Sequence, residues 1–437
     1  MDVDSVNDLL VRGEFDREGL FPHLEDLDRA PRVFEFDFGL RELPEEPAIL
    51  LIRGPRQYGK STWLEQQLRA SVLKYGPGSA LYLNGDEFAD SDSLLRALRG
   101  ALGLFRPTAP RRRLFIDEIT AVTGWERALK VLADRGELRR VLVVTTGSRA
   151  TDLRRGGERL PGRRGRLDRT TWLFTPVTFA EFLRVCQDDV ADDAVEAYLL
   201  AGGSPLALGE IAATGRLPEW LIELVRDWVN GEFSRSGRDR SALVPVMAVL
   251  SRTGGTPVGQ TRLAQEAGLA NNTVAAGYLE LLADLMCIGI QQAWDPSRKV
   301  PMPRTRAKYP FINLLAAVAW HPARLRTVAD FRRLPEVEQG RWIEWLVAQE
   351  IWRRRALRGD PFPERLLYWQ SQEHELDFVL DEWRLLEVKR GRASPREFAW
   401  FPRTHPGASL LLVNEDRFET EWLRGLTLRD LLLAPDW

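Results

Sequence analysis

A glycine-bracketed segment at residues 54–62 constrains this sequence more than any other feature. It follows the apolar stretch 48–52 and opens a run of good helix formers at 63–73. Its residues are Gly54, Pro55, Arg56, Gln57, Tyr58, Gly59, Lys60, Ser61 and Thr62. A strand, a glycine-bracketed loop and a helix start are the context in which G-x-x-x-x-G-K-[ST] indicates a phosphate-binding P-loop. The alternative is a glycine-rich turn that matches the pattern by chance.

The spacing of this motif has a chemical reason. Gly54 and Gly59 let the backbone curl so that successive N–H groups point at phosphate oxygens, next to the positive end of the following helix. Lys60 is expected to reach the terminal phosphates, and the Ser61 hydroxyl to ligate Mg²⁺. The segment by itself therefore predicts binding of a nucleoside triphosphate with Mg²⁺.

Strands and helices alternate from this region onward. Apolar strands are expected at 48–52, 80–83, 113–116 and 141–146, and helices at 60–75, 91–104 and 125–134. Such alternation predicts an α/β fold in which helices cover both faces of a parallel sheet.

The third strand ends in two carboxylates, Asp117 and Glu118, after the apolar residues 114–116. This is the Walker B arrangement: Asp117 is expected to hold the Mg²⁺ shell, and Glu118 to orient and deprotonate the attacking water. An apolar run followed by Asp-Glu is common and mostly structural. Its position after a P-loop favours the functional interpretation.

Two later segments offer further candidates for the nucleotide site. At the end of the fourth strand, either Thr146 or Ser148 can contact the γ-phosphate or position water, and the alternative is simple turn chemistry. The loop 154–166 is rich in arginine and glycine. Arg163 and Arg166 are candidate arginine fingers toward a neighbouring subunit's γ-phosphate. A solvated basic loop is the equally weighted alternative.

Bulk composition narrows the class of protein. A length of 437 residues suggests about three domains, and 44% hydrophobic with 28% charged residues is typical of a soluble globular chain. The net charge of −2 provides no global cationic field, so nucleic-acid contact requires local patches. Two distant cysteines, no signal peptide and no long apolar run predict a cytoplasmic protein without a membrane segment. Only six of the 61 basic residues are lysine, which makes each lysine a candidate for a specific role.

Taken in order, these motifs resemble the AAA-type ATPases of bacteria and archaea that carry an uncharacterised C-terminal region with a nuclease-like fold. The resemblance covers roughly residues 45–415 and rests on Gly54–Thr62, Leu114–Glu118, Thr146–Ser148, Leu160–Arg163, Thr175–Leu183, Gly202–Pro205 and the segments described next. It implies ATP as the nucleotide. The helical stretch 176–235, broken at residues 201–205, looks like the small lid that closes over a nucleotide in that family.

Residues 241–320 suggest a winged helix, with helices at 242–251, 261–269 and 271–285. The third of these lacks Lys and Arg from 270 to 286, so only Asn271 and Asn272 offer base contacts there. The positive charge lies in the following wing, at Arg298, Lys299, Arg304, Arg306 and Lys308. DNA contact by this module and a packing or assembly role are left as equal alternatives.

The last segment contains a second set of candidate catalytic residues. Asp377 and the pair Glu387 and Lys389 lie on an expected strand hairpin, with Glu387 and Lys389 on one face because side chains alternate along a strand. Two carboxylates and a lysine can bind Mg²⁺ and activate water against a phosphodiester. The pattern resembles the PD-(D/E)xK nuclease core, which implies Glu344 as the helix carboxylate. Basic segments at 353–358 and 389–396 are expected to flank the site. The alternative is a decayed nuclease fold.

These features predict five segments and one function. The segments are an N-terminal extension (1–47), a P-loop ATPase core (48–175), a helical lid (176–238), a winged helix (239–325) and a nuclease-like domain (326–437). The function is binding and hydrolysis of ATP with Mg²⁺ by a protein that acts on DNA and carries a metal-dependent nuclease domain under nucleotide control. A second Mg²⁺ or Mn²⁺ would serve the C-terminal domain, and partners would include DNA and another copy or another protein. The alternative is a nucleotide-switched signalling or scaffolding ATPase with an inactive C-terminal domain.

Overall fold

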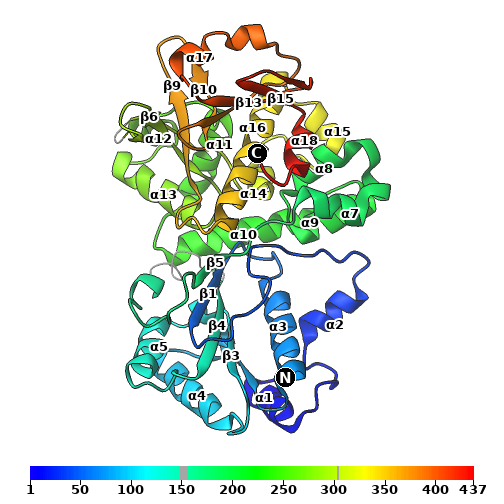
Figure 1. Ribbon diagram of the computed structural model, residues 1–437, viewed down its shortest axis with the longest axis vertical. Coiled ribbons are helices and arrows are strands. Elements are labelled where there is room, and N and C mark those ends of the chain that lie inside the picture. The colour runs from blue at the N-terminus through cyan, green and yellow to red at the C-terminus, as the bar shows by residue number, and fades with distance from the viewer. Residues whose placement is uncertain (148–155, 303–304) are drawn as a thin grey trace. The chain divides into compact units, whose positions relative to one another are not determined.

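Five parallel strands form the central sheet of the N-terminal region in the computed structural model (Figure 1). Their order is β2-β3-β4-β1-β5. The strands are β1 (Ile49–Arg53), β2 (Ala80–Asn84), β3 (Arg112–Asp117), β4 (Val141–Gly147) and β5 (Thr171–Leu173). β1 and β4 are buried at every position, as expected for strands that are covered on both faces. The predicted parallel α/β sheet is confirmed, with β5 as a strand that the sequence did not indicate.

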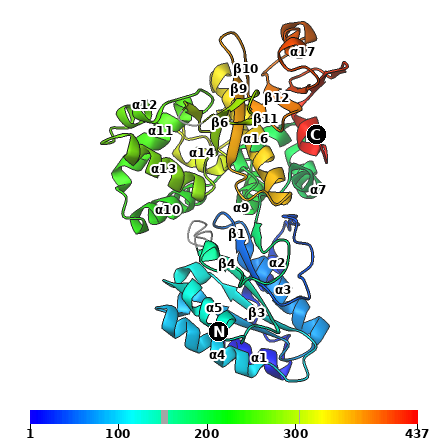
Figure 2. The same cartoon turned by 60° about the vertical axis from the view of Figure 1, so that its left-hand side comes forward.

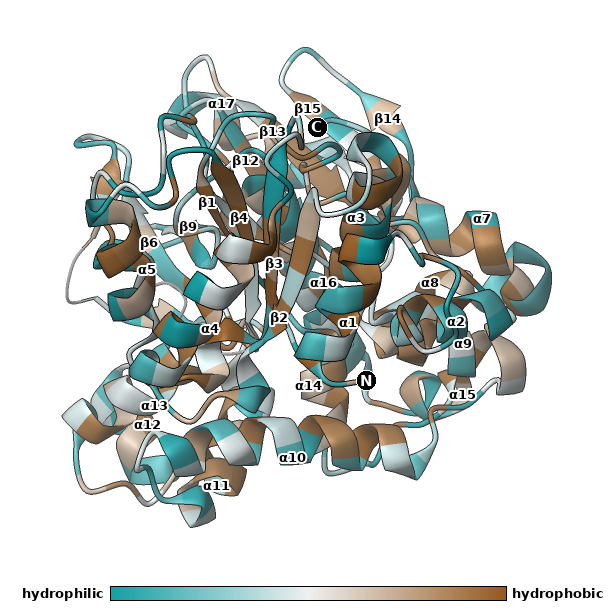
Figure 3. Cartoon of the chain, turned by 90° about the horizontal axis from the view of Figure 1, so that it is seen from below, coloured by the Kyte–Doolittle hydropathy of each residue, from teal (hydrophilic) through white to brown (hydrophobic). Residues whose placement is uncertain are grey.

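Helices cover both faces of this sheet. α4 (Ser91–Leu104) and α5 (Trp125–Asp134) pack on one face, and α3 (Lys60–Tyr75) lies on the other (Figures 1 and 2). The strands are mostly brown in Figure 3, whereas the helices alternate between brown and teal because each has one buried face. All three helices have the predicted bounds. Local signals explain this accuracy: Asp90 begins α4 with a capping box, and Gly59 and Gly124 begin α3 and α5 in the left-handed conformation.

The structure describes residues 1–147, 156–302 and 305–437, and these divide into two compact units. The first contains residues 1–33 and 37–175, and the second contains residues 34–36 and 176–437. The N-terminal helices α1 (Val3–Arg12) and α2 (Pro22–Arg29) belong to the first unit. Asn7 on α1 pairs with the backbone of Tyr82 on β2 at 2.8 Å in both directions, so this segment is attached to the sheet edge.

The second unit is built on helices around a large apolar core. The helices are α7 (Phe179–Val190), α8 (Ala194–Ala201), α9 (Pro205–Thr214), α10 (Glu219–Arg235), α11 (Leu243–Thr253), α12 (Gln260–Glu266), α13 (Asn272–Asp284), α14 (Leu314–Trp320), α15 (Val328–Arg332), α16 (Glu336–Leu357), α17 (Phe401–Thr404) and α18 (Leu428–Leu433). The long helix α16 contributes Trp342, Trp345 and Leu346 to this core. The helices that we expected for the lid and for the three-helix module are present within a few residues of the predicted bounds. The division into a lid, a winged helix and a nuclease-like domain stays a prediction.

Two sheets complete the second unit. One has the order β10-β9-β6-β7, with β8 also paired to β6, and the other has the order β11-β12-β13-β15-β14. The strands are β6 (Ile290–Asp295), β7 (Val300–Pro301), β8 (Ala307–Lys308), β9 (Arg365–Gln370), β10 (Glu375–Leu376), β11 (Phe378–Val379), β12 (Arg384–Val388), β13 (Ser409–Val413), β14 (Phe418–Glu419) and β15 (Leu423–Leu426). Because β6 pairs with β9 in parallel, the first sheet crosses the expected segment boundary at 325/326. The expected single strand at 376–380 is two short strands, with Asp377 where the chain passes from one sheet to the other.

None of the helices in the described ranges combines the length and the apolar character that crossing a bilayer requires.

A buried carboxyl in the first unit predicts a pH dependence. Glu65 on α3 accepts backbone N–H groups from His23 (2.9 Å) and Leu24 (3.2 Å), which ties α2 to α3. Burial raises the pKa of Glu65 from 4.5 to about 8. In the unfolded chain this carboxyl ionises near its ordinary pKa, so its contribution to stability is present at low pH and is lost as pH rises toward 8. Glu65→Gln keeps the acceptor without the charge, and should flatten the fall of the melting temperature across this range. Glu14→Gln, at an exposed position, should retain the wild-type slope; an unchanged slope in Glu65→Gln would contradict the assignment.

Candidate functional site

The loop between β1 and α3 needs glycine for two different reasons. Gly59 has φ of 91°, a left-handed conformation that begins α3. Gly54 is required by close packing instead, since a Cβ atom there would lie 2.7 Å from Cβ and 2.8 Å from the carbonyl oxygen of Phe174. Phe174 directly follows β5, so the strand that the sequence did not indicate supports the predicted phosphate loop.

Lys60 is folded back onto this loop. Its side chain is buried, and Nζ donates to the carbonyl oxygens of Gly54 (3.1 Å) and Pro55 (2.7 Å). Burial lowers the pKa of Lys60, and the nearby carboxylates of Glu118 and Asp117 oppose that shift. The ammonium is thus held at the mouth of the loop, where a negatively charged phosphate would be the stronger partner.

Several polar groups at the carboxyl end of the sheet donate hydrogen bonds to Asp117. Its carboxylate is 6% exposed and accepts hydrogen bonds from the hydroxyls of Ser61 and Thr146. The backbone N–H of Glu118 also donates to Asp117 Oδ1 at 3.0 Å. Burial raises the pKa of Asp117, which these hydrogen bonds oppose. Parallel pairing explains the meeting, because β3 and β4 deliver Asp117 and Thr146 to the same sheet edge.

Glu118 directly follows β3, at the point where the chain turns away from the strand. Its φ of 43° turns the chain out of β3 in a left-handed conformation. The turn passes so close to Gly85 that a Cβ atom on that glycine would lie 2.2 Å from the Glu118 carbonyl oxygen. Left-handed backbone at a non-glycine residue is costly and is common at functional sites.

These residues fit a nucleotide-bound Mg²⁺. Mg²⁺ prefers oxygen ligands and keeps several waters, so that one or two protein groups and substrate phosphates suffice. The Ser61 hydroxyl and the Asp117 carboxylate lie together at the start of α3 and the end of β3. Both candidate ligands are therefore in one place, next to Lys60.

The remaining nucleotide-site candidates are less well defined. Arg163 is engaged within the first unit, with Nε 2.5 Å from Oδ1 of Asp134 on α5. Arg166 is exposed. Ser148 and the loop residues 149–155 lie outside the described residues, so that of the two candidates on β4 only Thr146 is placed.

A cleft of about 760 Å³ in the second unit contains the other predicted site. Its lining comes from the turn after α11, from α16, from the segment around β10, from the end of β12 and from residues 397–400. Glu344, Asp377, Glu387 and Lys389 all line it, so residues up to 45 positions apart in sequence meet here. The lining also includes Arg341, Arg390 and the rings of His374 and Trp400, which stack with their centroids 4.0 Å apart.

Internal donors already engage the carboxylates of this cleft. Glu387 Oε1 lies 2.6 Å from Nζ of Lys389, and its Oε2 accepts the backbone N–H of Asp377 at 3.1 Å. Asp377 Oδ2 accepts the backbone N–H of Val388 at 2.9 Å. Burial, followed by the charge of Asp377, raises the pKa of Glu344 and of Glu387 to about 8.

Lys308 is the residue that sequence reasoning misplaced. We expected it on an exposed basic wing, but its side chain is 1% exposed and points among the carboxylates of the cleft. Its Nζ lies 2.5 Å from Glu375 Oε1, 3.3 Å from Asp377 Oδ1 and 3.6 Å from Glu344 Oε1. Burial lowers the pKa of Lys308, but the three carboxylates raise it more, and the net shift is upward. The rarity of lysine in this chain was the only sequence signal for this role.

The expected metal site at Glu344, Asp377 and Glu387 does not fit this arrangement. Across residues 1–147, 156–302 and 305–437, no group of three or more His, Cys, Asp and Glu side chains is placed to hold a metal ion.

The segment 353–358 does not form the basic flank that we expected. Arg353 and Arg354 are buried and paired with Glu350, at 2.7 and 2.6 Å, because α16 turns this face inward.

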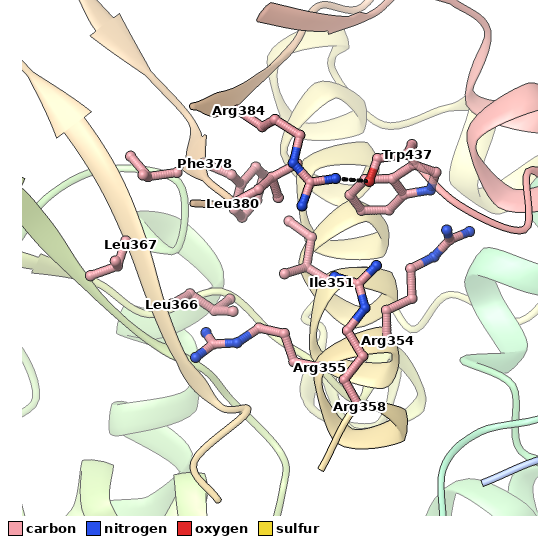
Figure 4. Close-up of a pocket in the computed structure, with 11 residues that line it drawn as sticks. Ile351, Arg354, Arg355, Arg358, Leu366, Leu367, Phe378, Leu380, Arg384 and Trp437 are labelled. Carbon is pink, nitrogen blue, oxygen red and sulfur yellow. Dashed lines mark hydrogen bonds between the residues drawn. The ribbon is translucent and has the colours of Figure 1, made fainter. Parts of the chain in front are cut away.

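A second hollow beside α16 has room for little more than ordered water. Its volume is about 30 Å³, and Figure 4 shows arginine side chains around Ile351. Arg355 is paired with Asp360 at 2.5 Å, and Arg384 donates to the Trp437 carbonyl oxygen at 3.1 Å. We therefore assign this hollow to the packing of the C-terminal residues.

The helix expected to read DNA bases, α13, uses one of its two candidate residues internally. The side chain of Asn271 caps α13 by accepting the backbone N–H of Val274 at 2.9 Å. Asn272, the first residue of the helix, is exposed.

Gly54→Ala should destabilise the first unit, because the added methyl would meet the Phe174 backbone. Overpacking of this kind costs about 1–3 kcal/mol in the free energy of unfolding. Gly100→Ala is the matched control, since Gly100 lies within α4 with open space where a Cβ would stand. That substitution should be neutral or stabilising by up to about 1 kcal/mol. Urea unfolding of the full chain measures both; equal effects at the two positions would refute the packing role of Gly54.

The phosphate loop lies in a region of the chain that is similar to known proteins. Residues 46–183 match the family model AAA_14, described as an AAA domain. The uncharacterized protein MJ1637 of Methanocaldococcus jannaschii is 28% identical over 159 residues, which are 36% of this chain and 32% of that protein. The chain thus matches about a third of the length of that relative.

Similar solved structures share low identity with this chain. ORC1 of Aeropyrum pernix in complex with DNA is 14% identical, covers 81% of this chain and 92% of its own, and has a TM-score of 0.32. A RuvB variant of Thermotoga maritima is 17% identical, covers 60% and 84%, and has a TM-score of 0.30. These scores carry no argument about function. The family match covers the part of the chain that contains the parallel sheet and the phosphate loop, residues 46–183.

Proposed function

We propose that the first unit binds and hydrolyses ATP with Mg²⁺. The observation that supports this most directly is the meeting of Asp117, Ser61 and Thr146 beside the glycine-bracketed loop that holds Lys60. Phosphoryl transfer requires positioning and charge stabilisation rather than covalent participation by the protein, and these residues supply both.

Each side chain has a distinct part in this reaction. Lys60 leaves the loop carbonyls for the phosphate oxygens and stabilises the charge that develops on them. Ser61 and Asp117 hold the Mg²⁺ that neutralises the phosphates, and Thr146 keeps the Asp117 carboxylate oriented. Glu118, turned out of β3, positions the attacking water and accepts its proton.

An arginine from a second copy would complete the site if the protein assembles through this face. Arg166 is the better candidate, because Arg163 is held by Asp134 within its own unit. An added positive charge at the γ-phosphate stabilises the transition state in related chemistry.

Substitution of Lys60 and Glu118 separates binding from hydrolysis. Lys60→Ala should abolish ATP hydrolysis because the phosphates lose their main cation. Glu118→Gln should retain ATP binding and lower kcat by about 100-fold or more, since the general base is lost. Lys74→Ala, at an exposed position near the end of the same helix, should hydrolyse at the wild-type rate. Phosphate release and nucleotide-binding assays on the full chain measure these effects; a Lys60→Ala protein with the wild-type rate would refute the proposal.

For the second unit, we propose that the cleft binds DNA. The lining includes the cationic side chains of Arg341, Lys389 and Arg390 and the stacked rings of His374 and Trp400. Single-stranded nucleic acids are commonly bound by positive charge combined with aromatic side chains. We also propose that ATP binding in the first unit controls DNA binding by the second, whereas the sequence predicted such nucleotide control for a nuclease domain.

Metal-dependent cleavage of DNA in this cleft is the second candidate function. The convergence of Glu344, Asp377, Glu387 and Lys389 favours it. The placement of Lys308 among the same carboxylates opposes it. The geometry thus supports DNA binding without metal-dependent cleavage better than it supports a nuclease.

A DNA assay with Mg²⁺ or Mn²⁺ discriminates between these two functions. We expect the wild type to bind a labelled oligonucleotide and to leave it intact, with or without ATP. Lys389→Ala should weaken binding several-fold, because it removes a cation from the cleft. Lys130→Ala, on α5 of the first unit, should bind like the wild type. Cleavage that requires the metal and disappears in both Asp377→Ala and Lys389→Ala would establish the nuclease instead.

A further inference from the structure

We propose that Lys308 is the resident cation of the C-terminal cleft. Its ammonium takes the place of a divalent metal ion among Glu344, Glu375 and Asp377, so that the wild-type cleft takes up no Mg²⁺ or Mn²⁺. The inference deepens the proposed function of the second unit and does not depend on ATP hydrolysis by the first.

The carboxylates converge on the lysine nitrogen. Three oxygens, one from each side chain, lie 2.5–3.6 Å from Nζ of Lys308. These distances suit an ammonium, whereas oxygen ligands of Mg²⁺ lie at about 2.0–2.1 Å. A divalent cation at the same point would coincide with the ammonium, and a cation beside it would face an unscreened like charge.

Backbone pairing keeps Lys308 in this position. β8 pairs with β6 on one side, where Lys308 is opposite Gln291. On the other side, Val258 and Ala307 exchange backbone hydrogen bonds at 2.9 and 3.2 Å. The Gln291 side chain is buried and donates to the carbonyl oxygens of Leu367 and Asp377. Backbone pairing therefore fixes the position from which the Lys308 side chain reaches the carboxylates.

Other carboxylate oxygens of the cleft are engaged by donors of the protein itself. The second oxygen of Asp377 and both oxygens of Glu387 accept from Val388, Lys389 and the Asp377 backbone. Glu344 Oε1 has no hydrogen-bond partner in the described part of the chain, and Lys308 at 3.6 Å is the cation that it faces. Lys308 and Lys389 thus face the four carboxyl groups of Glu344, Glu375, Asp377 and Glu387, and burial raises the pKa of Glu344 and of Glu387 to about 8.

The positive charge among these carboxylates therefore comes from a side chain of the protein and not from a bound metal ion. Here β8, from the region expected to form the wing of a winged helix, supplies the charge and joins that region to the strands around Asp377. Lys308 is a positioning residue: it sets the geometry of Glu344 and Asp377.

Direct titration of the nucleotide-free full chain with Mn²⁺ tests this inference. Each protein is titrated with and without the additional substitution Asp377→Asn, and the difference in bound Mn²⁺ is the binding that depends on the cleft. Any Mn²⁺ bound at the P-loop is the same with and without this substitution and cancels. We expect none in the wild type and about one equivalent in Lys308→Met, which leaves three carboxylates with no resident cation. Mn²⁺ should also raise the melting temperature of Lys308→Met by a few degrees or more without affecting that of the wild type.

Lys299→Met is the matched control, because Lys299 lies in the same strand-turn region but is 58% exposed and pairs with Glu382. It should bind Mn²⁺ like the wild type. An Asp377-dependent equivalent of Mn²⁺ in the wild type would overturn the inference, even if Lys308→Met does not fold. A folded Lys308→Met protein that gains no Mn²⁺ would also overturn it. Neither result would alter the expected loss of ATP hydrolysis in Lys60→Ala.

Discussion

A buried charge destabilises a fold unless partners surround it, and both sites of this protein are arranged by that constraint. In the first unit, Lys60 rests on two loop carbonyls while Asp117 accepts two hydroxyls and a backbone N–H. In the second unit, Lys308 is enclosed by three carboxylates. The difference lies in what completes each site. The partners of Lys60 are neutral carbonyl groups that a phosphate can replace, whereas the partners of Lys308 are carboxyl groups of the protein that already surround it.

Because of this difference, the site of Lys60 can accept an anionic ligand, whereas the site of Lys308 already contains the cation that its carboxyl groups require. An ammonium that is bound only by carbonyl oxygens gains more from an anion than it loses on leaving them. A lysine paired with carboxylates in a low-dielectric pocket gains nothing from a second cation nearby. The nucleotide chemistry that we propose for the first unit and the metal-free character that we infer for the cleft follow from the same electrostatics.

Sequence reasoning was most accurate where structure is determined locally. The bounds of α3, α4 and α5 match the prediction because capping residues and left-handed glycines define the helix starts within a few residues of sequence. It missed β5, because this strand has three residues of which two are half-buried, too short for a periodic signal. It also missed that β6 and β9 share a sheet, because that pairing joins residues about 75 positions apart and leaves no local mark.

The sequence by itself determined the phosphate loop, the two carboxylates after β3 and the α/β class, since each depends on residue types at short, defined spacing. Tertiary structure alone decided what surrounds each charge. Asp117 meets Thr146 because β3 and β4 are neighbours in a parallel sheet. Lys308 lies among Glu344, Glu375 and Asp377 because β8 pairs with β6 between distant segments. The environment of a charge depends on long-range contacts, and these are the property that local sequence patterns do not contain.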